Sequence, residues 1–181
     1  MSSVAGGEKC VQPILVAVNF EPPASAALRF AARLAAETGA PLKILHVVHE
    51  PAERPNYYGR LSGPDVTVPM EILAGRLLDE FLRNLDVQGP ALDSLESADV
   101  MLVKGLPATR IPEVARKSAA GQIVMGHTGP HGLFGGLFSS LSDRVADRCD
   151  IPVTVIHPDG SRAAQVKSSR DPFTGDMALG T

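Results

Sequence analysis

The order of apolar and polar positions along the chain predicts strands and helices in alternation. Five short apolar stretches, each bounded by polar residues, glycine or proline, have the length of buried strands. They are residues 13–19, 42–48, 100–103, 122–125 and 153–156. The unbroken apolar run from Ile14 to Val18 is typical of a parallel strand that is covered on both faces.

Between these strands, apolar residues recur at the three- and four-residue spacing of amphipathic helices. The spacing predicts four helices: one from Pro22 to a stop at Gly39, one from Val68 to Leu85, one after Pro107, and one from Ser139 to Cys149. Residues 50–66 are polar and contain three prolines and two glycines, so we expect a loop there.

Strands that alternate with helices pair in parallel through right-handed crossovers. The pattern therefore predicts one α/β domain over residues 12–158, a doubly wound, five-stranded parallel sheet with four helices, of the flavodoxin-like kind. Residues 1–11 are expected to form a flexible arm. Residues 159–181 have few apolar positions and no periodicity, which predicts a disordered tail.

Composition excludes several classes of function. The 181 residues carry a net charge of −3, whereas a nucleic-acid-binding surface needs clustered Lys and Arg. No apolar stretch reaches the roughly 20 residues that cross a bilayer, and the first residues lack the apolar core of a signal peptide. We therefore expect a cytoplasmic protein that binds neither nucleic acid nor membrane.

The segment after the fourth predicted strand is the richest in candidate chemistry. Gly126 and Gly129 follow the strand, a glycine-rich loop comes next, and a helical pattern begins after Ser139-Ser140. Glycines let the backbone approach an anion closely, and free N–H groups at a helix start favour negative charge. A phosphate or nucleotide site is one interpretation, and an ordinary strand-to-helix connection is the other.

Topology would decide whether this loop belongs to a site. In doubly wound sheets, ligands bind beyond the carboxyl ends of the strands, where the strand order reverses. Asn19 closes the first predicted strand and Gly126 closes the fourth. If those strands are neighbours, both residues line one crevice.

Several motifs, in this order, give the chain a resemblance to the universal stress protein family over about residues 12–158. They are Ile14–Val18 with a polar residue next, Leu45-His46-Val47-Val48, Val103-x-Gly105-x-Pro107, Gly126-x-x-Gly129 with Ser139-Ser140 after nine residues, and Ile151–Ile156. The resemblance implies an adenine nucleotide α-hydrolase-like fold. It also implies a role in stress tolerance.

The resemblance further implies an ATP site, with or without Mg²⁺. Nucleotide-binding members carry Gly, two residues, Gly, nine residues, then Gly followed by Ser or Thr. By that pattern, the phosphates would lie over the 126–129 turn and against the first N–H groups of the last helix. The adenine and ribose would contact the ends of the first two strands. The implied contact residues are Ala17, Val18, Asn19, Val47, Met125, Gly126, His127, Gly129, Ser139, Ser140 and Leu141.

The chain departs from the family pattern at two of these positions. Asn19 stands where members commonly have Asp, and it offers both an acceptor and a donor. Ser139 replaces the third glycine, which costs about 1 kcal/mol if that residue needs a positive φ. Ser139 would otherwise crowd a phosphate, donate to it, or simply cap the last helix. Ser140 with Asp143 also has the spacing of a capping box.

No catalytic or metal-binding residues are predicted. The chain lacks a nucleophile–base pair and the Gly-x-x-x-x-Gly-Lys-Ser/Thr motif, so at most slow ATP hydrolysis is expected. His127 and His131 are four apart, but Pro130 between them argues against one helix face. Glu21 could hold Mg²⁺ through water, although a solvated loop carboxylate is the simpler interpretation. His46 is expected to be a hydrogen-bonded core histidine.

The last predicted strand indicates how the chain could associate. As an edge strand, Val153, Thr154, Val155 and Ile156 would expose unpaired backbone groups. Pairing with the same strand of a second copy would solve this, and the resemblance implies such a homodimer. The alternative is that the tail covers the edge.

The main hypothesis is thus a dimeric regulatory protein that binds ATP and acts on an unknown partner. A nucleotide-free interaction module and a slow ATPase are the alternatives.

Overall fold

In the computed structural model, which describes residues 11–49, 57–58, 68–127 and 140–166, the predicted strands form a single sheet. These five strands are β1 (Ile14–Ala17), β2 (Leu42–Val48), β3 (Asp99–Lys104), β4 (Gln122–Gly126) and β5 (Val153–Ile156), and a sixth strand that was not predicted, β6 (Arg162–Val166), joins them. Their order in the sheet is β3-β2-β1-β4-β5-β6, and the first five strands pair in parallel. The predicted five-stranded, doubly wound parallel sheet is confirmed.

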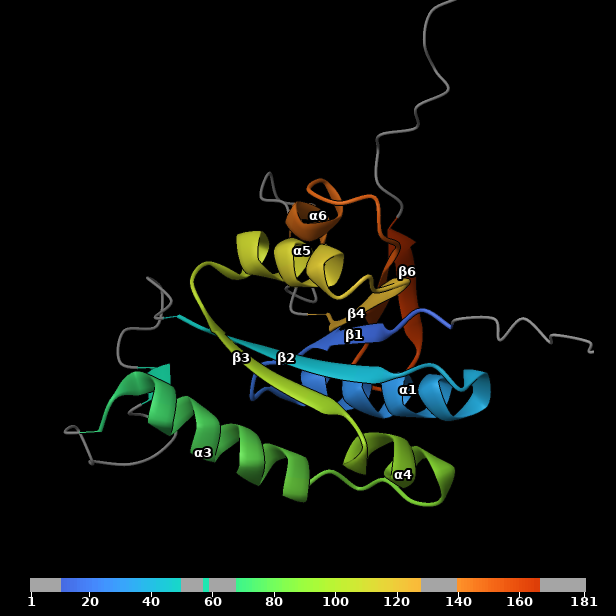
Figure 1. Ribbon diagram of the computed structural model, residues 1–181, viewed down its shortest axis with the longest axis horizontal. Helices are drawn as coiled ribbons and strands as arrows, with labels where there is room; N and C mark the ends of the chain where they lie inside the picture. Colours follow the sequence, from blue (N-terminus) through green and yellow to red (C-terminus); the bar gives the residue numbers. More distant parts are fainter. Residues whose placement is uncertain (1–10, 50–56, 59–67, 128–139, 167–181) are drawn as a thin grey trace, which may run out of the picture.

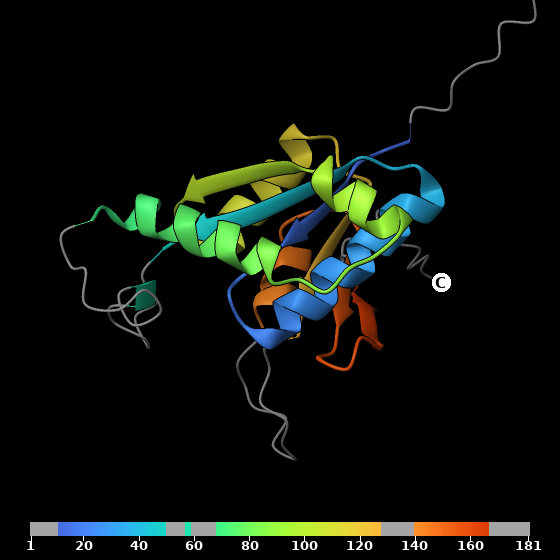
Figure 2. The same ribbon diagram turned by 90° about the horizontal axis from the view of Figure 1, so that it is seen from below.

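Helices cover both faces of this sheet (Figures 1 and 2). They are α1 (Pro22–Thr38), α3 (Met70–Arg83), α4 (Pro90–Glu96), α5 (Pro107–Lys117) and α6 (Leu141–Ala146). Figure 1 shows α1, α3 and α4 on one side, with α5 and α6 on the other. The sequence predicted all of these except α4. That helix has seven residues and buries only Ala91, too short a pattern to stand out. Among the described residues, no helix is long and apolar enough to cross a membrane.

Strand β1 shows why its residues are apolar without interruption. Ile14 and Val16 belong to the cluster that contacts α1, whereas Leu15 belongs to the cluster under α5 and α6. All three are at most 4% exposed. Successive side chains of a strand point to opposite faces, so a strand between two helical layers needs apolar residues at every position.

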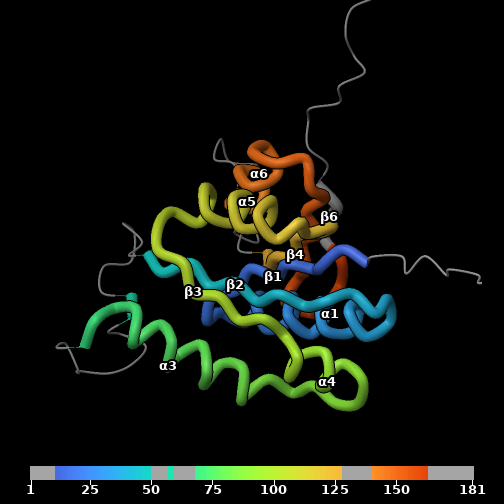
Figure 3. The backbone as a smooth tube through the Cα atoms, viewed as in Figure 1, coloured from blue at the N-terminus to red at the C-terminus, as the bar shows by residue number. Residues whose placement is uncertain are grey.

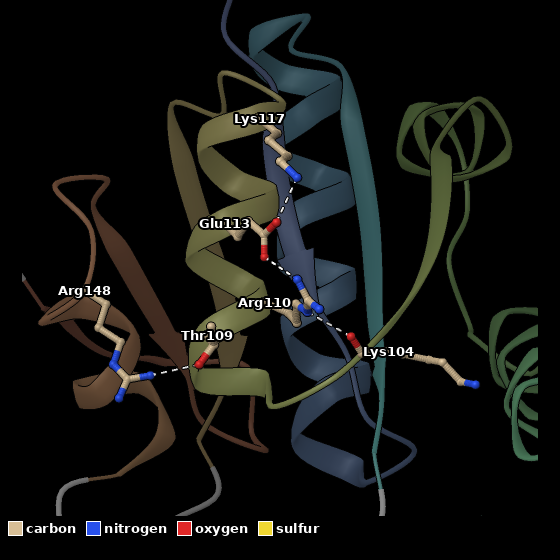
Figure 4. Close-up of polar contacts among 6 residues, drawn as sticks. All are labelled: Lys104, Thr109, Arg110, Glu113, Lys117 and Arg148. Carbon is tan, nitrogen blue, oxygen red and sulfur yellow. Dashed lines mark hydrogen bonds and ion pairs between the residues drawn. The ribbon is translucent and has the colours of Figure 1, made fainter.

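The turn from β3 into α5 explains the spacing of Gly105 and Pro107. Gly105 has φ +133°, and a Cβ atom there would lie 2.7 Å from Nε of Arg110. That Nε donates a hydrogen bond to the carbonyl oxygen of Lys104 at 2.9 Å (Figure 4). Pro107 then supplies the first residue of the helix, where no N–H partner is needed.

Strand β6 corrects two expectations. Residues 162–166 lie in the segment predicted to be a disordered tail, yet they pair antiparallel with β5. The outer edge of β5 has backbone groups that need partners, and β6 supplies them. The alternative in which the tail covers this edge is therefore the one observed. The premise that Val153–Ile156 form a free edge for a homodimer is wrong.

Candidate functional site

The condition for a crevice at the carboxyl end of the sheet is met. β1 pairs with β4 in parallel, and Ala17 lies opposite Met125 in the register. On its other side β1 pairs with β2, where Ala17 lies opposite Leu45. Strands β2 and β3 therefore lie on one side of β1, and strands β4 and β5 lie on the other. Figure 3 shows β1 between β2 and β4. This is the point of strand-order reversal where doubly wound sheets bind ligands.

Most of the residues expected to hold the base and ribose lie together at these strand ends. Val18, Val47 and Met125 are each at most 5% exposed, and Ala17 is half-buried. The N–H of Val18 donates to the carbonyl oxygen of Leu45 at 2.9 Å, which extends the β1–β2 pairing past the end of β1. The strand ends thus form an apolar floor for the proposed site.

Gly126 lies in close contact with the backbone at the start of α1, whereas the sequence suggested a close approach to a bound anion. A Cβ atom at this position would lie 2.5 Å from both the carbonyl carbon and the oxygen of Pro23, and 2.8 Å from the N of Ala24. The first turn of α1 therefore lies directly against the end of β4. Gly126 is needed for this helix–strand packing whether or not an anion binds beside it.

Asn19 begins the turn into α1. Its Oδ1 accepts a hydrogen bond from the N–H of Glu21 at 3.3 Å, which is an Asx turn. The side chain is half-buried at the end of β1. Its acceptor is thus engaged in the turn that connects β1 to α1.

Ser140, and not Ser139, caps the last helix. The N–H of Asp143 donates to Oγ of Ser140 at 3.1 Å, and the N–H of Ser140 donates to Oδ2 of Asp143 at 2.9 Å. Oγ of Ser140 also donates to the same carboxylate at 2.8 Å. A carboxylate therefore occupies one of the N–H groups expected to bind phosphate, and the next residue, Leu141, begins the helix.

His127 follows β4 directly. Its N–H donates to the carbonyl oxygen of Ile156 at 2.8 Å, and its ring packs edge-on against that of His157 with 5.0 Å between centroids. Gly129, Ser139 and His131 lie outside the described residues. Among the residues that are described, no group of three His, Cys, Asp or Glu side chains could hold a metal ion.

A buried polar network lies next to these strand ends. Nδ1 of His46 donates to the carbonyl oxygen of Val18 at 2.8 Å, and Nε2 lies 3.0 Å from the hydroxyl of Tyr58. That hydroxyl also accepts from the N–H of His49 at 3.2 Å. In a neutral ring whose proton is on Nδ1, Nε2 is an acceptor, so the hydroxyl donates to it. Burial lowers the pKa of His46, which favours this neutral ring.

The expectation of a hydrogen-bonded core histidine is confirmed for His46. Tyr58 was missed, because it lies in a stretch whose prolines and polar residues indicate only a loop. The ring of Phe20 packs against that of His46, with 4.5 Å between the centroids and an angle of 32° between the ring planes. The signal that could have found the network is the pair Tyr57-Tyr58, the chain's two tyrosines.

A shallow pocket of about 250 Å³ lies between the start of α1 and α3. Its lining residues are Phe20, Ser25, Leu77, Glu80, Phe81 and Asn84. Phe20 directly follows Asn19, so this pocket adjoins the predicted base-binding end. None of its lining residues belongs to the predicted set.

The sequence model of the universal stress protein family matches residues 11–157. The chain belongs to this family. No relative matches among curated protein sequences. The similar solved structures include universal stress proteins, and the family assignment agrees with the observed fold.

Three of these structures give the scale of the similarity. The universal stress protein UspA from Lactobacillus plantarum is 24% identical with a TM-score of 0.58, over 80% of this chain and 97% of that one. A universal stress protein in complex with cAMP is 21% identical with a TM-score of 0.56, over 82% and 98%. The universal stress protein from Archaeoglobus fulgidus in complex with dAMP is 22% identical with a TM-score of 0.50, over 81% and 98%.

Proposed function

We propose that this chain is an adenine-nucleotide-binding universal stress protein that acts in stress tolerance in the cytoplasm, with ATP as its ligand. The observation that carries the proposal is the pairing of β1 with β4. It brings Ala17 opposite Met125 at the point where the strand order reverses. Two structural neighbours, in complex with cAMP and dAMP, support an adenine nucleotide as the ligand class.

In this proposal the base and ribose contact the buried strand ends, and the phosphates extend toward Gly129 and the start of α6. ATP turns over slowly at most, and its presence regulates a partner. A homodimer through Val153–Ile156 stays part of the proposal as a second state. It requires β6 to leave the edge that it occupies.

One observation favours a second candidate, a nucleotide-free interaction module of the same fold. The carboxylate of Asp143 holds both the N–H and the Oγ of Ser140. It presents a negative charge where the phosphates would lie. A like charge about 4 Å away in water opposes a phosphate by about 1 kcal/mol, which is about fivefold in affinity.

The charge of Asp143 therefore provides a test of where the phosphates bind. Acid extraction of the purified protein identifies any nucleotide carried through, and calorimetry then measures binding of Mg-ATP and of adenosine. Asp143→Asn keeps an oxygen for the helix cap and is expected to bind ATP about fivefold more tightly, with adenosine binding unchanged. Asp147→Asn removes the same charge at the other end of α6 and serves as the matched control.

The proposal expects saturable binding of ATP that Gly129→Val abolishes. Absence of binding at millimolar ATP, in the wild type and in Asp143→Asn, would establish the interaction module instead. Phosphate release well above that of Gly129→Val would indicate the slow ATPase.

A further inference from the structure

The sheet has two edges, and in the part of the chain that the structure describes only one of them is covered. β6 pairs with the outer side of β5, whereas β3 pairs with β2 alone among the described strands. Figure 2 shows β3 in yellow-green and β6 in orange-red at opposite borders of the sheet. The outer side of β3 is therefore an open edge, whose backbone groups can pair with another strand.

The backbone of β3 fixes which residues face outward. The N–H of Gly105 donates to the carbonyl oxygen of Val48 at 3.1 Å, so it points toward β2. Successive residues of a strand direct their N–H and C=O groups to opposite sides. Val100 and Leu102 are five and three residues before Gly105, so their N–H and C=O groups point to the open side.

The side chains of the same two residues form an apolar patch beside this edge. Val100 is 43% exposed and Leu102 is 44% exposed. They lie on the α3 side of the sheet, because a Cβ atom at Gly75 would be 3.7 Å from Cδ1 of Leu102. Met101 and Val103 point to the opposite side, where they pack against the cluster under α5 and α6. Half-exposed apolar residues on an edge strand mark a site of strand pairing.

The sequence of β3, Asp-Val-Met-Leu-Val-Lys, suits a second copy of itself. Antiparallel pairing about a two-fold axis at Met101 places Val100 opposite Leu102 of the second copy, on the same face of the joined sheet. The axis generates this pair twice. Both residues have outward backbone groups, so each pair exchanges N–H···O hydrogen bonds and brings the two apolar side chains into contact.

The charges at its ends give the pairing a direction. Asp99 begins β3 and Lys104 ends it, so antiparallel pairing brings opposite charges together and parallel pairing brings like charges together. Both also form ion pairs within the chain, Asp99 with Lys43 and Lys104 with Glu71. Exposed ion pairs contribute little, so the charges set the orientation while the apolar pairs and the backbone hydrogen bonds supply the affinity.

We propose that the open edge of β3 is an interaction surface for a second copy of this chain, paired antiparallel about Met101. β6 covers the opposite edge of each sheet, so association ends at two copies and does not continue into a filament. This surface is different from Val153–Ile156, and it is separate from the crevice between β1 and β4. The inference therefore does not rest on nucleotide binding.

A charge swap tests both the surface and the register, by sedimentation equilibrium of nucleotide-free, full-length protein. We expect a monomer–dimer equilibrium for the wild type, with a dissociation constant below about 1 mM. Val100→Glu or Leu102→Lys alone puts a charge opposite an apolar residue at both pairs, and should raise the dissociation constant at least about tenfold. The double variant Val100→Glu/Leu102→Lys places opposite charges in both pairs. Its dissociation constant should return to within about threefold of the wild-type value.

Val11 provides the matched control. It is a valine of nearly the same exposure, 42%, and it precedes β1 in the middle of the sheet. Val11→Glu should leave the dissociation constant unchanged. Because Val100 and Leu102 are half-exposed, their variants should keep the circular dichroism spectrum of the wild type. Recovery of the dimer in the double variant separates a lost contact from a folding defect.

Three results would overturn the proposal. One is a wild type that stays monomeric up to about 1 mM. Another is a dimer that Val100→Glu weakens no more than Val11→Glu does, which is the result expected of a dimer through Val153–Ile156. The third is a double variant that dimerises no better than its two single parents, because that contradicts the pairing of Val100 with Leu102.

Discussion

Replacing Gly126 with alanine tests how the first turn of α1 is held against β4. The added Cβ would lie 2.5 Å from the carbonyl carbon and oxygen of Pro23, and 2.8 Å from the N of Ala24. These are backbone atoms of a helix start, so no side-chain rotation can relieve the contact. α1 or the end of β4 must shift, and overpacking of this kind costs about 1–3 kcal/mol. We expect Gly126→Ala to lower the free energy of unfolding by about 2–3 kcal/mol.

Gly75 in α3 provides the matched control. A Cβ atom there would lie 3.7 Å from Cδ1 of Leu102, an ordinary contact. Because glycine is unfavourable inside a helix, Gly75→Ala should raise the free energy of unfolding by about 0.5–1 kcal/mol. The same chemical change should therefore have opposite signs at the two positions.

Urea unfolding followed by far-ultraviolet circular dichroism measures both variants against the wild type. The reasoning fails if Gly126→Ala unfolds within about 0.5 kcal/mol of the wild type, the range of a neutral surface substitution. A large loss also has a consequence for binding studies. Weaker nucleotide binding by a Gly126 variant would not identify a phosphate contact, because the variant disturbs α1 as well.

The remaining predictions concern single side chains. Burial lowers the pKa of His46 below its usual 6.5, so the unfolded chain binds a proton that the folded chain does not. The free energy of unfolding should therefore fall as the pH drops below about 6.5, by at most about 1.4 kcal/mol per pH unit. Urea titrations at several pH values should show this slope, and His46→Gln should remove it. Tyr58→Phe removes the hydroxyl that lies against Nε2 of His46 and should cost about 1–3 kcal/mol of unfolding free energy in the same assay. Ser140→Ala removes the cap of α6 and should cost about 1 kcal/mol, with Ser140→Thr retaining most of the stability. Hydrogen bonds, first from Lys117 and then from Arg110, hold the pKa of Glu113 at about 2 (Figure 4); a carboxyl titration by NMR should show this value, and Lys117→Ala should raise it.

The parts of the fold that the sequence predicted are those whose local pattern and tertiary role agree. The apolar run of β1 reflects its burial between two helical layers, so it could be recognised without knowing the neighbours of the strand. The pairing of β1 with β4 was only a condition, since a sequence pattern does not set strand order. Gly126 shows a different limit. Close approach to an anion and close approach to a helix both require the absence of a Cβ atom, so the sequence could not separate them.

The elements that were missed owe their structure to tertiary contacts. The alanines and glutamine of β6 have little preference for strands, and it is the open edge of β5 that makes them pair. The turn residues Asp159-Gly160 were the available signal, since this dipeptide is typical of hairpins. Asp143 is another case: its spacing from Ser140 fits a capping box, but only the structure shows that its carboxylate holds the N–H expected for phosphate.

The central place of β1 also bears on how the chain is made. Of the described strands, β1 leaves the ribosome before the others, and β2 and β3 can pair beside it as they emerge. Its other neighbour, β4, begins only at Gln122, roughly a hundred residues later, or ~5–20 s at the usual rates of synthesis. During that interval one side of a fully apolar strand has no partner. We expect nascent chains that end before Gln122 to bind chaperones that recognise extended apolar segments, and longer ones to be released.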